Sequence, residues 1–180
     1  KYCEDIGKPL NIAELTKERL RKAGGSIKSE KPDWSGDSGF RVFKLDKSNI
    51  RAWNPNSSDL KTSLFDHLEH LESGRSSDDI LYEILLKLGL DLCVPIEVRE
   101  IAGKQVNSVG AGVLMACLDA SVKASEAEAL DLGMAAWREE QGTVGDTTAV
   151  FRDSAFENDI AKSNLAAVLE QHGVKHVRSL

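Results

Sequence analysis

The stretch that decides the fold is PIEVREIAGKQVNSVGAGVLMACL, residues 95–118. It contains three short runs rich in β-branched and apolar residues, Ile96–Ile101, Gln105–Val109 and Val113–Leu118. Gly103 separates the first two runs, and Gly110-Ala111-Gly112 separates the second from the third. Short β-like runs divided by glycine turns predict three consecutive antiparallel strands.

Downstream of these strands, helical and strand patterns alternate. A helix is predicted around 124–139, a strand at Thr148–Phe151, a helix over 156–171 that ends at Gly173, and a last strand at Val174–Val177. The order β-β-β-α-β-α-β is typical of a small α/β or α+β domain built on a mixed sheet.

Two amphipathic helices are predicted upstream of the strands. Residues 59–71 carry a leucine stripe at helical spacing. Residues 77–88 form the second helix, which Ser76 caps with Asp79 three residues later and which Gly89 ends. These two helices would connect the front of the chain to the mixed sheet.

The front of the chain begins with a helix and ends with a strand-like run. Asn11 can cap the helix, and Gly24-Gly25 is predicted to stop it. After a polar loop, Phe40–Leu45 alternates apolar and basic residues, which predicts a half-buried strand with Phe40 and Val42 turned inward and Leu45 as a further candidate.

Composition is that of a globular chain, with 41% hydrophobic and 29% charged residues. No run approaches the roughly 18 apolar residues of a membrane span. The chain starts at Lys1 without a leader pattern, which suggests that it begins inside a longer protein. Cys3, Cys93 and Cys117 are odd in number and lack CxxC spacing, so a reduced cytoplasmic setting and small core thiols are expected rather than disulfides or zinc.

Charge is distributed unevenly along the chain. Residues 1–54 hold 12 Lys/Arg and 8 Asp/Glu, a net charge of +4. The whole chain has a net charge of −6, so residues 55–180 carry −10. This asymmetry is expected if only the front faces nucleic acid, although an ordinary solvated surface gives the same count.

Three blocks of sequence carry a family resemblance. The first is NIAELTKERLRKA at 11–23, and the second is SGFRVFKLDKSN at 38–49. The third is divided among DILYEILLKLG at 79–89, VFRDS at 150–154 and VRSL at 177–180. Read together and in this order, the blocks resemble the modification (Mod) subunit of type III restriction-modification systems. None of them is a catalytic motif, and their colinearity makes the likeness specific.

The resemblance implies a division of the chain into two parts. Residues 1–54 would be the tail of the doubly wound, S-adenosylmethionine-dependent methyltransferase domain, and residues 55–180 a helical connector followed by an α/β assembly domain. The implied activity of the full cytoplasmic subunit is site-specific transfer of a methyl group from S-adenosylmethionine to the exocyclic amine of adenine in duplex DNA. The implied partners are double-stranded DNA, a second Mod subunit in a homodimer, and the restriction (Res) subunit.

The two motifs that this chemistry requires do not occur in the chain. An Asp-Pro-Pro-Tyr loop would hold the flipped adenine, and a Phe-x-Gly-x-Gly turn would approach the cofactor. The four prolines are isolated from one another, and Gly110-Ala111-Gly112 is interpreted as a turn between strands. No catalytic, cofactor-binding or metal residue is therefore assigned. The isolated fragment is expected to be inactive and to serve dimerisation and subunit assembly; the alternative is an interaction domain without DNA or cofactor contact.

Several polar residues have competing interpretations. Asp66, His67 and His70 have a spacing that can bind a metal, but a polar helix face is favoured. Trp34 and Trp53 could stack on bases, but packing against the core or a neighbouring subunit is favoured.

The basic residues of the front have two interpretations as well. Arg19, Arg21 and Lys22 could contact phosphates, with a solvated helix face as the favoured alternative. Arg41 and Lys44 flank the predicted strand, and ordinary extension of their charged ends into solvent is expected.

Arg152-Asp153-Ser154 lies at the end of a predicted strand. A nucleophilic Ser154 would need a histidine base, for which His172 and His176 are the candidates. A helix N-cap made by the Asp/Ser pair is the favoured interpretation.

Overall fold

The computed structural model describes residues 2–5, 7–51 and 71–180. The chain divides into two compact units, unit 1 at Lys1–Leu45 and unit 2 at Asp46–Leu180. Together they hold helices and a five-stranded mixed sheet, which confirms the α/β class. Among the described helices, none combines the length and hydropathy needed to cross a bilayer.

Unit 1 contains helices α1 (Tyr2–Asp5) and α2 (Ile12–Glu30). The Asn11 side chain accepts a hydrogen bond from the Glu14 backbone N–H at 2.8 Å, which confirms the predicted cap. The predicted stop at Gly24-Gly25 is wrong, because α2 continues through both glycines to Glu30. Glycine in a helix interior costs about 1 kcal/mol relative to alanine but does not block the helical conformation.

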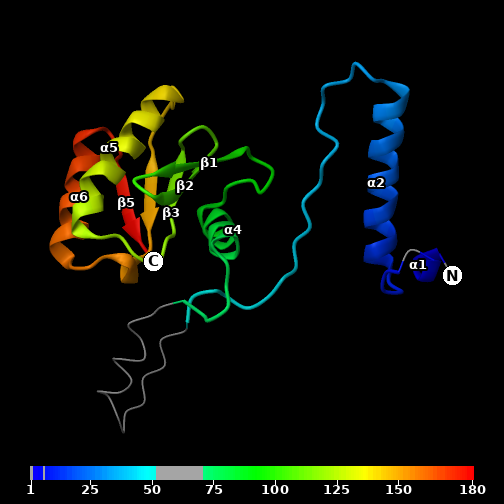
Figure 1. Ribbon diagram of the computed structural model, residues 1–180, viewed down its shortest axis with the longest axis horizontal. Helices are drawn as coiled ribbons and strands as arrows, with labels where there is room; N and C mark the ends of the chain where they lie inside the picture. Colours follow the sequence, from blue (N-terminus) through cyan, green and yellow to red (C-terminus); the bar gives the residue numbers. More distant parts are fainter. Residues whose placement is uncertain (1, 6, 52–70) are drawn as a thin grey trace, which may run out of the picture. The chain divides into compact units, whose positions relative to one another are not determined.

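The predicted strand at Phe40–Leu45 is also wrong. The segment is extended and returns along α2 (Figure 1), but it has no ladder partner within the described residues. Phe40 is 38% exposed, Val42 is 56% exposed, and Leu45 is fully exposed. An alternating pattern suits a sheet, but a strand forms only when a neighbouring strand satisfies its backbone hydrogen bonds.

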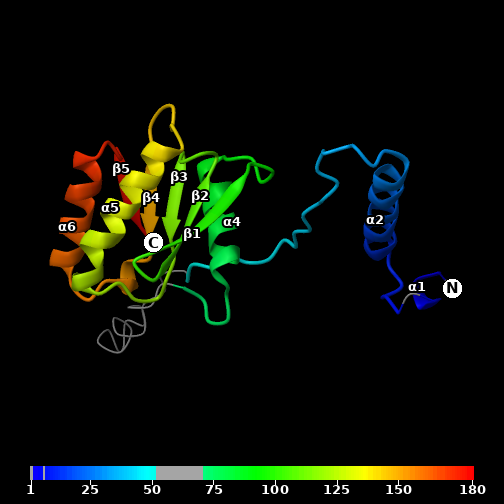
Figure 2. The same cartoon turned by 45° about the horizontal axis from the view of Figure 1, so that its top comes forward.

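Unit 2 is built on one sheet with strand order β1-β2-β3-β4-β5 (Figure 2). The strands are β1 (Ile96–Ile101), β2 (Lys104–Val109), β3 (Leu114–Cys117), β4 (Thr148–Phe151) and β5 (His176–Ser179). β1, β2 and β3 pair antiparallel, whereas β3, β4 and β5 pair parallel. The antiparallel meander and the mixed sheet are thus confirmed.

The last strand begins two residues later than predicted. Val174 is buried, and its N–H donates to the Leu169 carbonyl at 3.0 Å. Gly173 has a φ of +83°, so Gly173 and Val174 complete the end of the preceding helix. The strand therefore starts at His176.

Three helices cover the sheet: α4 (Ser77–Leu88) on one face, and α5 (Ala124–Glu140) with α6 (Asp159–Gln171) on the other (Figure 2). Along β3, Leu114 and Ala116 pack in the α4 layer, while Met115 and Cys117 pack in the layer of α5 and α6. This alternation follows from the two-residue period of a strand. The result is a three-layer α/β/α arrangement with a core on each side of the sheet.

The helix ends in unit 2 follow the sequence signals in most places. Ser76 and Asp79 form the predicted capping box, and Gly89 ends α4 with a φ of +70°. The helix predicted to start at 156 begins instead at Asp159, because Asn158 caps it and the short 3-10 helix η1 (Asp153–Ala155) precedes it.

The two glycine turns are confirmed as connections between strands. Ala102 and Gly103 both have positive φ angles and join β1 to β2 as a two-residue hairpin loop of type I′. Gly110, Ala111 and Gly112 all have positive φ and join β2 to β3.

Residues 46–51 belong to unit 2, so the structural division falls before the expected boundary at residue 54. The Asn49 backbone N–H and the Ser48 hydroxyl donate to the Glu83 carboxylate of α4 at 2.7 Å and 2.5 Å. Ile50 forms an isolated β-bridge with Leu71. The rest of the predicted 59–71 helix lies outside the described residues.

The cysteines have different environments. Cys117 is buried in the core, and this burial raises the pKa of its thiol to about 11. Cys93 is exposed in the loop before β1, so the expectation of a core position is wrong for this residue. Cys93 belongs to neither of the two core clusters.

Candidate functional site

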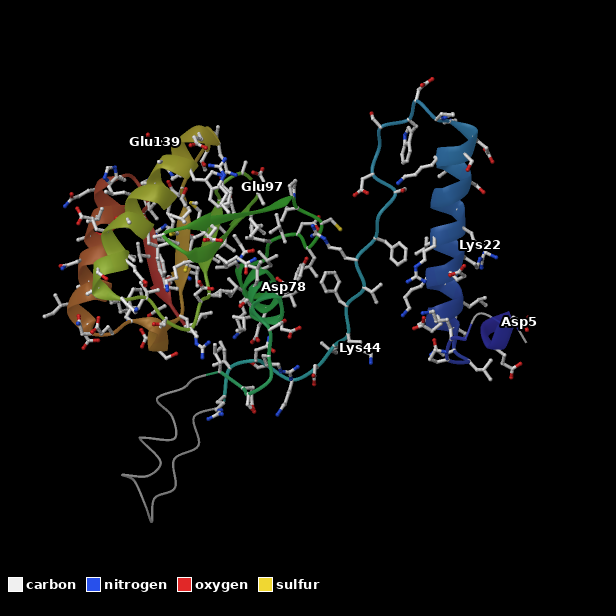
Figure 3. All side chains as sticks on the ribbon, viewed as in Figure 1. Asp5, Lys22, Lys44, Asp78, Glu97 and Glu139 are labelled. Carbon is white, nitrogen blue, oxygen red and sulfur yellow. The ribbon has the colours of Figure 1, made fainter. Side chains whose placement is uncertain are left out.

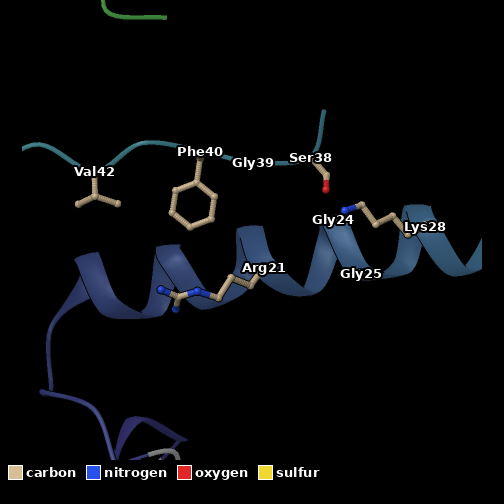
Figure 4. A pocket seen from close by; sticks show the side chains of 8 residues that line it. All are labelled: Arg21, Gly24, Gly25, Lys28, Ser38, Gly39, Phe40 and Val42. Carbon is tan, nitrogen blue, oxygen red and sulfur yellow. The ribbon is translucent and has the colours of Figure 1, made fainter. Parts of the chain in front are cut away.

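A groove of about 480 Å³ lies inside unit 1 between α2 and the extended segment that follows it (Figure 4). The α2 side contributes two basic side chains and two glycines, and the extended side contributes small and apolar residues. The lining residues are Arg21, Gly24, Gly25, Lys28, Ser38, Gly39, Phe40 and Val42.

The glycines of α2 set how closely the segment approaches. A Cβ added at Gly24 would lie 3.3 Å from the Ser38 Cβ, closer than ordinary van der Waals contact, whereas one at Gly25 would meet nothing within 4 Å. Across the groove, the Gly39 backbone N–H donates to the Asp37 carboxylate at 2.7 Å, a local turn that directs the chain back along α2. The helix therefore exposes bare backbone at the floor of the groove.

The two basic residues lie on the same face of α2. Arg21 and Lys28 are seven residues apart, which corresponds to two helical turns and a rise of about 10 Å. The Arg21 guanidinium carbon lies 5.8 Å from the centre of the Phe40 ring, and its Nη1 lies 3.5 Å from the Glu18 carboxylate. In the part of the chain that the structure describes, Lys28 forms no ion pair.

Cations beside an open backbone floor and an aromatic ring suit a phosphate-bearing ligand. Arg and Lys bind phosphate oxygens, and a half-exposed ring offers a face for stacking. The groove contains no carboxylate of its own, so its lining carries a net positive charge.

Only one of the three basic residues predicted to contact phosphates lines this groove. Arg21 does so, while Arg19 and Lys22 project from other faces of α2 (Figure 3 labels Lys22). Lys28 was not predicted. The signal that could have found it is the helical spacing of Arg21, Gly24, Gly25 and Lys28, which places two cations and two glycines on one face.

Arg41, Lys44 and Trp34 lie outside the lining of the groove. Arg41 and Lys44 are exposed on the extended segment, as expected for basic residues in solvent. The Trp34 ring covers Gly36 of its own loop, where an added Cβ would lie 2.3 Å from the ring. Trp34 is 38% exposed and belongs to neither core cluster, so the expected packing against the core is not observed.

The structure does not bring Ser154 and the two histidines together. Ser154 precedes α6 and His172 follows it, and a helix of 13 residues separates its ends by about 20 Å. His176 pairs with Thr148 at the start of β4, while Ser154 lies beyond the end of that strand. The Ser154 hydroxyl accepts a hydrogen bond from Arg152 Nε at 3.1 Å.

The favoured interpretation, in which Asp153 and Ser154 form the N-cap of the following helix, is wrong as well. Asn158 caps α6 by accepting from the Ala161 backbone N–H at 2.8 Å, and Asp153 instead pairs with Lys162. Residues 155–158 separate the Asp/Ser pair from the helix start, so the pair lies too early to act as its cap.

Asp66, His67, His70 and Trp53 lie outside the described residues. Within residues 2–5, 7–51 and 71–180, no group of three or more His, Cys, Asp or Glu could hold a metal ion.

The Gly110-Ala111-Gly112 turn does not fit S-adenosylmethionine. The cofactor turn of such enzymes joins a strand to a helix, where small residues let the backbone approach the ligand. Gly110-Ala111-Gly112 joins two antiparallel strands instead, and an added Cβ at Gly112 would lie 2.2 Å from the Thr143 hydroxyl oxygen. Its glycines therefore serve the turn and its contact with the loop after α5.

Comparison of the chain with protein-family models, with curated proteins and with solved structures finds no match.

Proposed function

We propose that this chain is the C-terminal part of a DNA adenine methyltransferase, the modification subunit of a type III restriction-modification system. The full subunit would transfer the methyl group of S-adenosylmethionine to adenine in duplex DNA. This part contributes DNA-backbone contact and assembly, and it supplies no catalytic or cofactor-binding residue. The observation that carries the proposal is the cationic groove of unit 1, at the front of the chain where the sequence blocks begin.

The charge of the two units supports this division of labour. Unit 1 has 10 Lys/Arg and 7 Asp/Glu, a net charge of +3. Because the whole chain carries −6, unit 2 carries −9. Acidic residues such as Asp78, Glu97 and Glu139 are exposed on unit 2 (Figure 3). An acidic surface repels a phosphate backbone, so unit 1 is the part suited to DNA.

The extended segment at residues 40–45, which is not part of any strand among the described residues, supports a connection to a larger sheet. It alternates apolar and basic residues, it is extended, and its apolar side chains are exposed. An extended segment with this pattern can add to the edge of a sheet and bury alternate side chains there. In the proposed full subunit, the methyltransferase sheet provides that edge.

A second candidate function is a protein-interaction module without DNA contact. The observation that favours it is the exposure of large apolar side chains in unit 1, among them Leu20, Ile27, Val42 and Phe43. Exposed apolar patches often mark protein-binding surfaces. This candidate predicts assembly with a second Mod copy or with the Res subunit and no affinity for DNA.

A salt titration of duplex DNA binding separates the two candidates. For the wild-type chain, log affinity should fall linearly as log salt rises. In Arg21→Gln/Lys28→Gln, the slope should decrease by about 2, because each phosphate contact contributes about 0.9. Arg19→Gln, on another face of α2, is the matched control and should change the slope by less than about 0.5.

Absence of salt-sensitive binding in the wild-type chain would favour the interaction module. The open reading frame provides an independent test. Asp-Pro-Pro-Tyr and Phe-x-Gly-x-Gly upstream of Lys1 would support the methyltransferase class, and a complete upstream sequence without them would refute it.

A further inference from the structure

The sheet of unit 2 has two edges, β1 and β5. β1 pairs with β2 along all six of its residues, and no strand among the described residues lies on its other side. Its central residues, 97–100, are all exposed, and Val98 is 52% exposed. β5 is shorter, and its four residues include no carboxylate. β1 is therefore the edge with the length and the mixed charge to pair with a further strand.

The direction in which each β1 residue directs its backbone groups follows from the pairing with β2. The Gly110 N–H donates to the Pro95 carbonyl at 3.0 Å, so this pair, one position before the strand, is hydrogen-bonded. Hydrogen-bonded and non-hydrogen-bonded pairs alternate along an antiparallel ladder, so Glu97 and every second residue after it bond to β2. The residues whose N–H and C=O face outward, away from β2, are Ile96, Val98 and Glu100.

The face of β1 on the side of α5 carries two opposite charges. Ile101 packs in the layer of α5 and α6, so Glu97 and Arg99 share that face by the two-residue period of a strand. Arg99 Nη1 lies 2.6 Å from the Glu140 carboxylate of α5, and the Arg99 side chain is still 46% exposed. Glu97 forms no ion pair with any residue that the structure describes. Because a guanidinium group has several donors, Arg99 can bind a second carboxylate and keep its contact with Glu140.

The sequence of β1 is self-complementary in one antiparallel register. Two copies can pair about a two-fold axis only where outward-facing groups meet one another. An axis at Glu97 or at Arg99 sets two identical charges directly opposite each other, which is unfavourable. An axis at Val98 sets Glu97 of each copy opposite Arg99 of the other. These are non-hydrogen-bonded pairs, in which opposing side chains lie closest.

We propose that β1 pairs with β1 of a second copy of this chain, antiparallel about an axis at Val98, so that the two sheets join into one. The inference rests on the assembly role proposed above and names the surface that carries it. Charges on an edge strand normally prevent pairing with other chains. In β1 the order of the charges opposes other partners and favours a second copy, because the pairing forms two Glu97–Arg99 ion pairs. It also covers the exposed Val98 side chains and satisfies the outward backbone groups.

Sedimentation equilibrium of the full chain tests the proposal. The wild-type chain should dimerise. Glu97→Arg and Arg99→Glu each set like charges opposite each other and should weaken the dimer at least about tenfold. An equimolar mixture of these two variants should restore dimers, because each repulsive pair becomes an attractive one in the mixed dimer. Glu170→Arg makes the same charge change on α6, away from β1, and should dimerise as the wild-type chain does.

Val98→Pro tests the backbone contacts separately. Proline removes an N–H that β2 does not use, and edge strands tolerate proline at such positions. The variant should keep the wild-type circular dichroism spectrum and lose the dimer. Because it leaves the contact between Arg99 and Glu140 intact, it decides the proposal even if Arg99→Glu fails to fold.

A monomeric wild-type chain would overturn the proposal. So would dimers that Val98→Pro and Glu97→Arg leave unchanged, or folded charge variants whose mixture stays monomeric. Arg21→Gln/Lys28→Gln alters only unit 1 and should dimerise as the wild-type chain does. Absence of salt-sensitive DNA binding in a chain that dimerises through β1 therefore counts against the proposed DNA contact, whereas DNA binding by a monomeric chain counts against this inference.

Discussion

The runs FRVFKL at 40–45 and IEVREI at 96–101 carry similar patterns, apolar residues interspersed with charged ones. The second is strand β1, paired along its length with β2, and the first has no strand partner in the described parts of the chain. β1 is an edge strand with Val98 still 52% exposed, so burial alone does not explain the difference. A tight Ala102-Gly103 turn supplies β1 with a partner immediately, whereas nothing adjacent supplies residues 40–45 with one.

The two units that contain these runs also differ in how much apolar surface they bury. Unit 2 buries a core on each face of its sheet, while α2 of unit 1 contains no buried residue. The comparison indicates that unit 2 supplies its own stability and that unit 1 depends on further contacts.

The largest expected effect tests this difference directly. Leu85→Ala in unit 2 removes a fully buried side chain and should lower the free energy of unfolding by about 2–5 kcal/mol. Leu20→Ala in α2 alters a side chain that is 47% exposed and should change the free energy of unfolding by less than about 1 kcal/mol. Urea denaturation of both variants gives the comparison, and equal losses would contradict it.

An intermediate effect is expected at Glu83, which attaches residues 46–51 to α4. Burial raises the pKa of this carboxyl, but hydrogen bonds from Lys87, Ser48 and the Asn49 backbone outweigh burial and lower it to about 2. A depressed pKa stabilises the fold above pH 4.5, and this contribution is lost as the pH falls from 4.5 toward 2.

Glu83→Gln should therefore destabilise unit 2 by roughly 1–3 kcal/mol at pH 6. The difference from wild type should shrink as the pH approaches 2, where the wild-type carboxyl is protonated. Denaturation of both proteins at pH 6 and pH 3 measures this. Glu97→Gln, on the exposed edge strand, is the control, and a pH-independent difference at Glu83 would contradict the assignment.

The smallest effect concerns the adjacent glycines of α2. Gly25→Ala should stabilise the helix by about 1 kcal/mol, because its Cβ meets nothing within 4 Å. Gly24→Ala should stabilise the helix less or not at all, because its Cβ would lie 3.3 Å from the Ser38 Cβ. Amide hydrogen exchange across α2 reports both changes, and equal protection in the two variants would show that the extended segment does not pack there.

The sequence by itself determined the local features of this protein. Caps at Asn11 and Ser76, the stop at Gly89 and the glycine turns of the meander were predictable, because each depends on a few neighbouring residues. Most elements of unit 2 followed from periodicity for the same reason. The front of α2 was predictable, but its continuation through Gly24-Gly25 was not.

Only the tertiary structure decided which alternating run became a strand and which charged residues meet. Among the described residues, the run at 40–45 joins no sheet. Ser154 and His172 lie at opposite ends of α6, and Arg21 shares its groove with Lys28 rather than with Arg19. Pairing and convergence depend on contacts between distant segments, and a single sequence does not record those contacts.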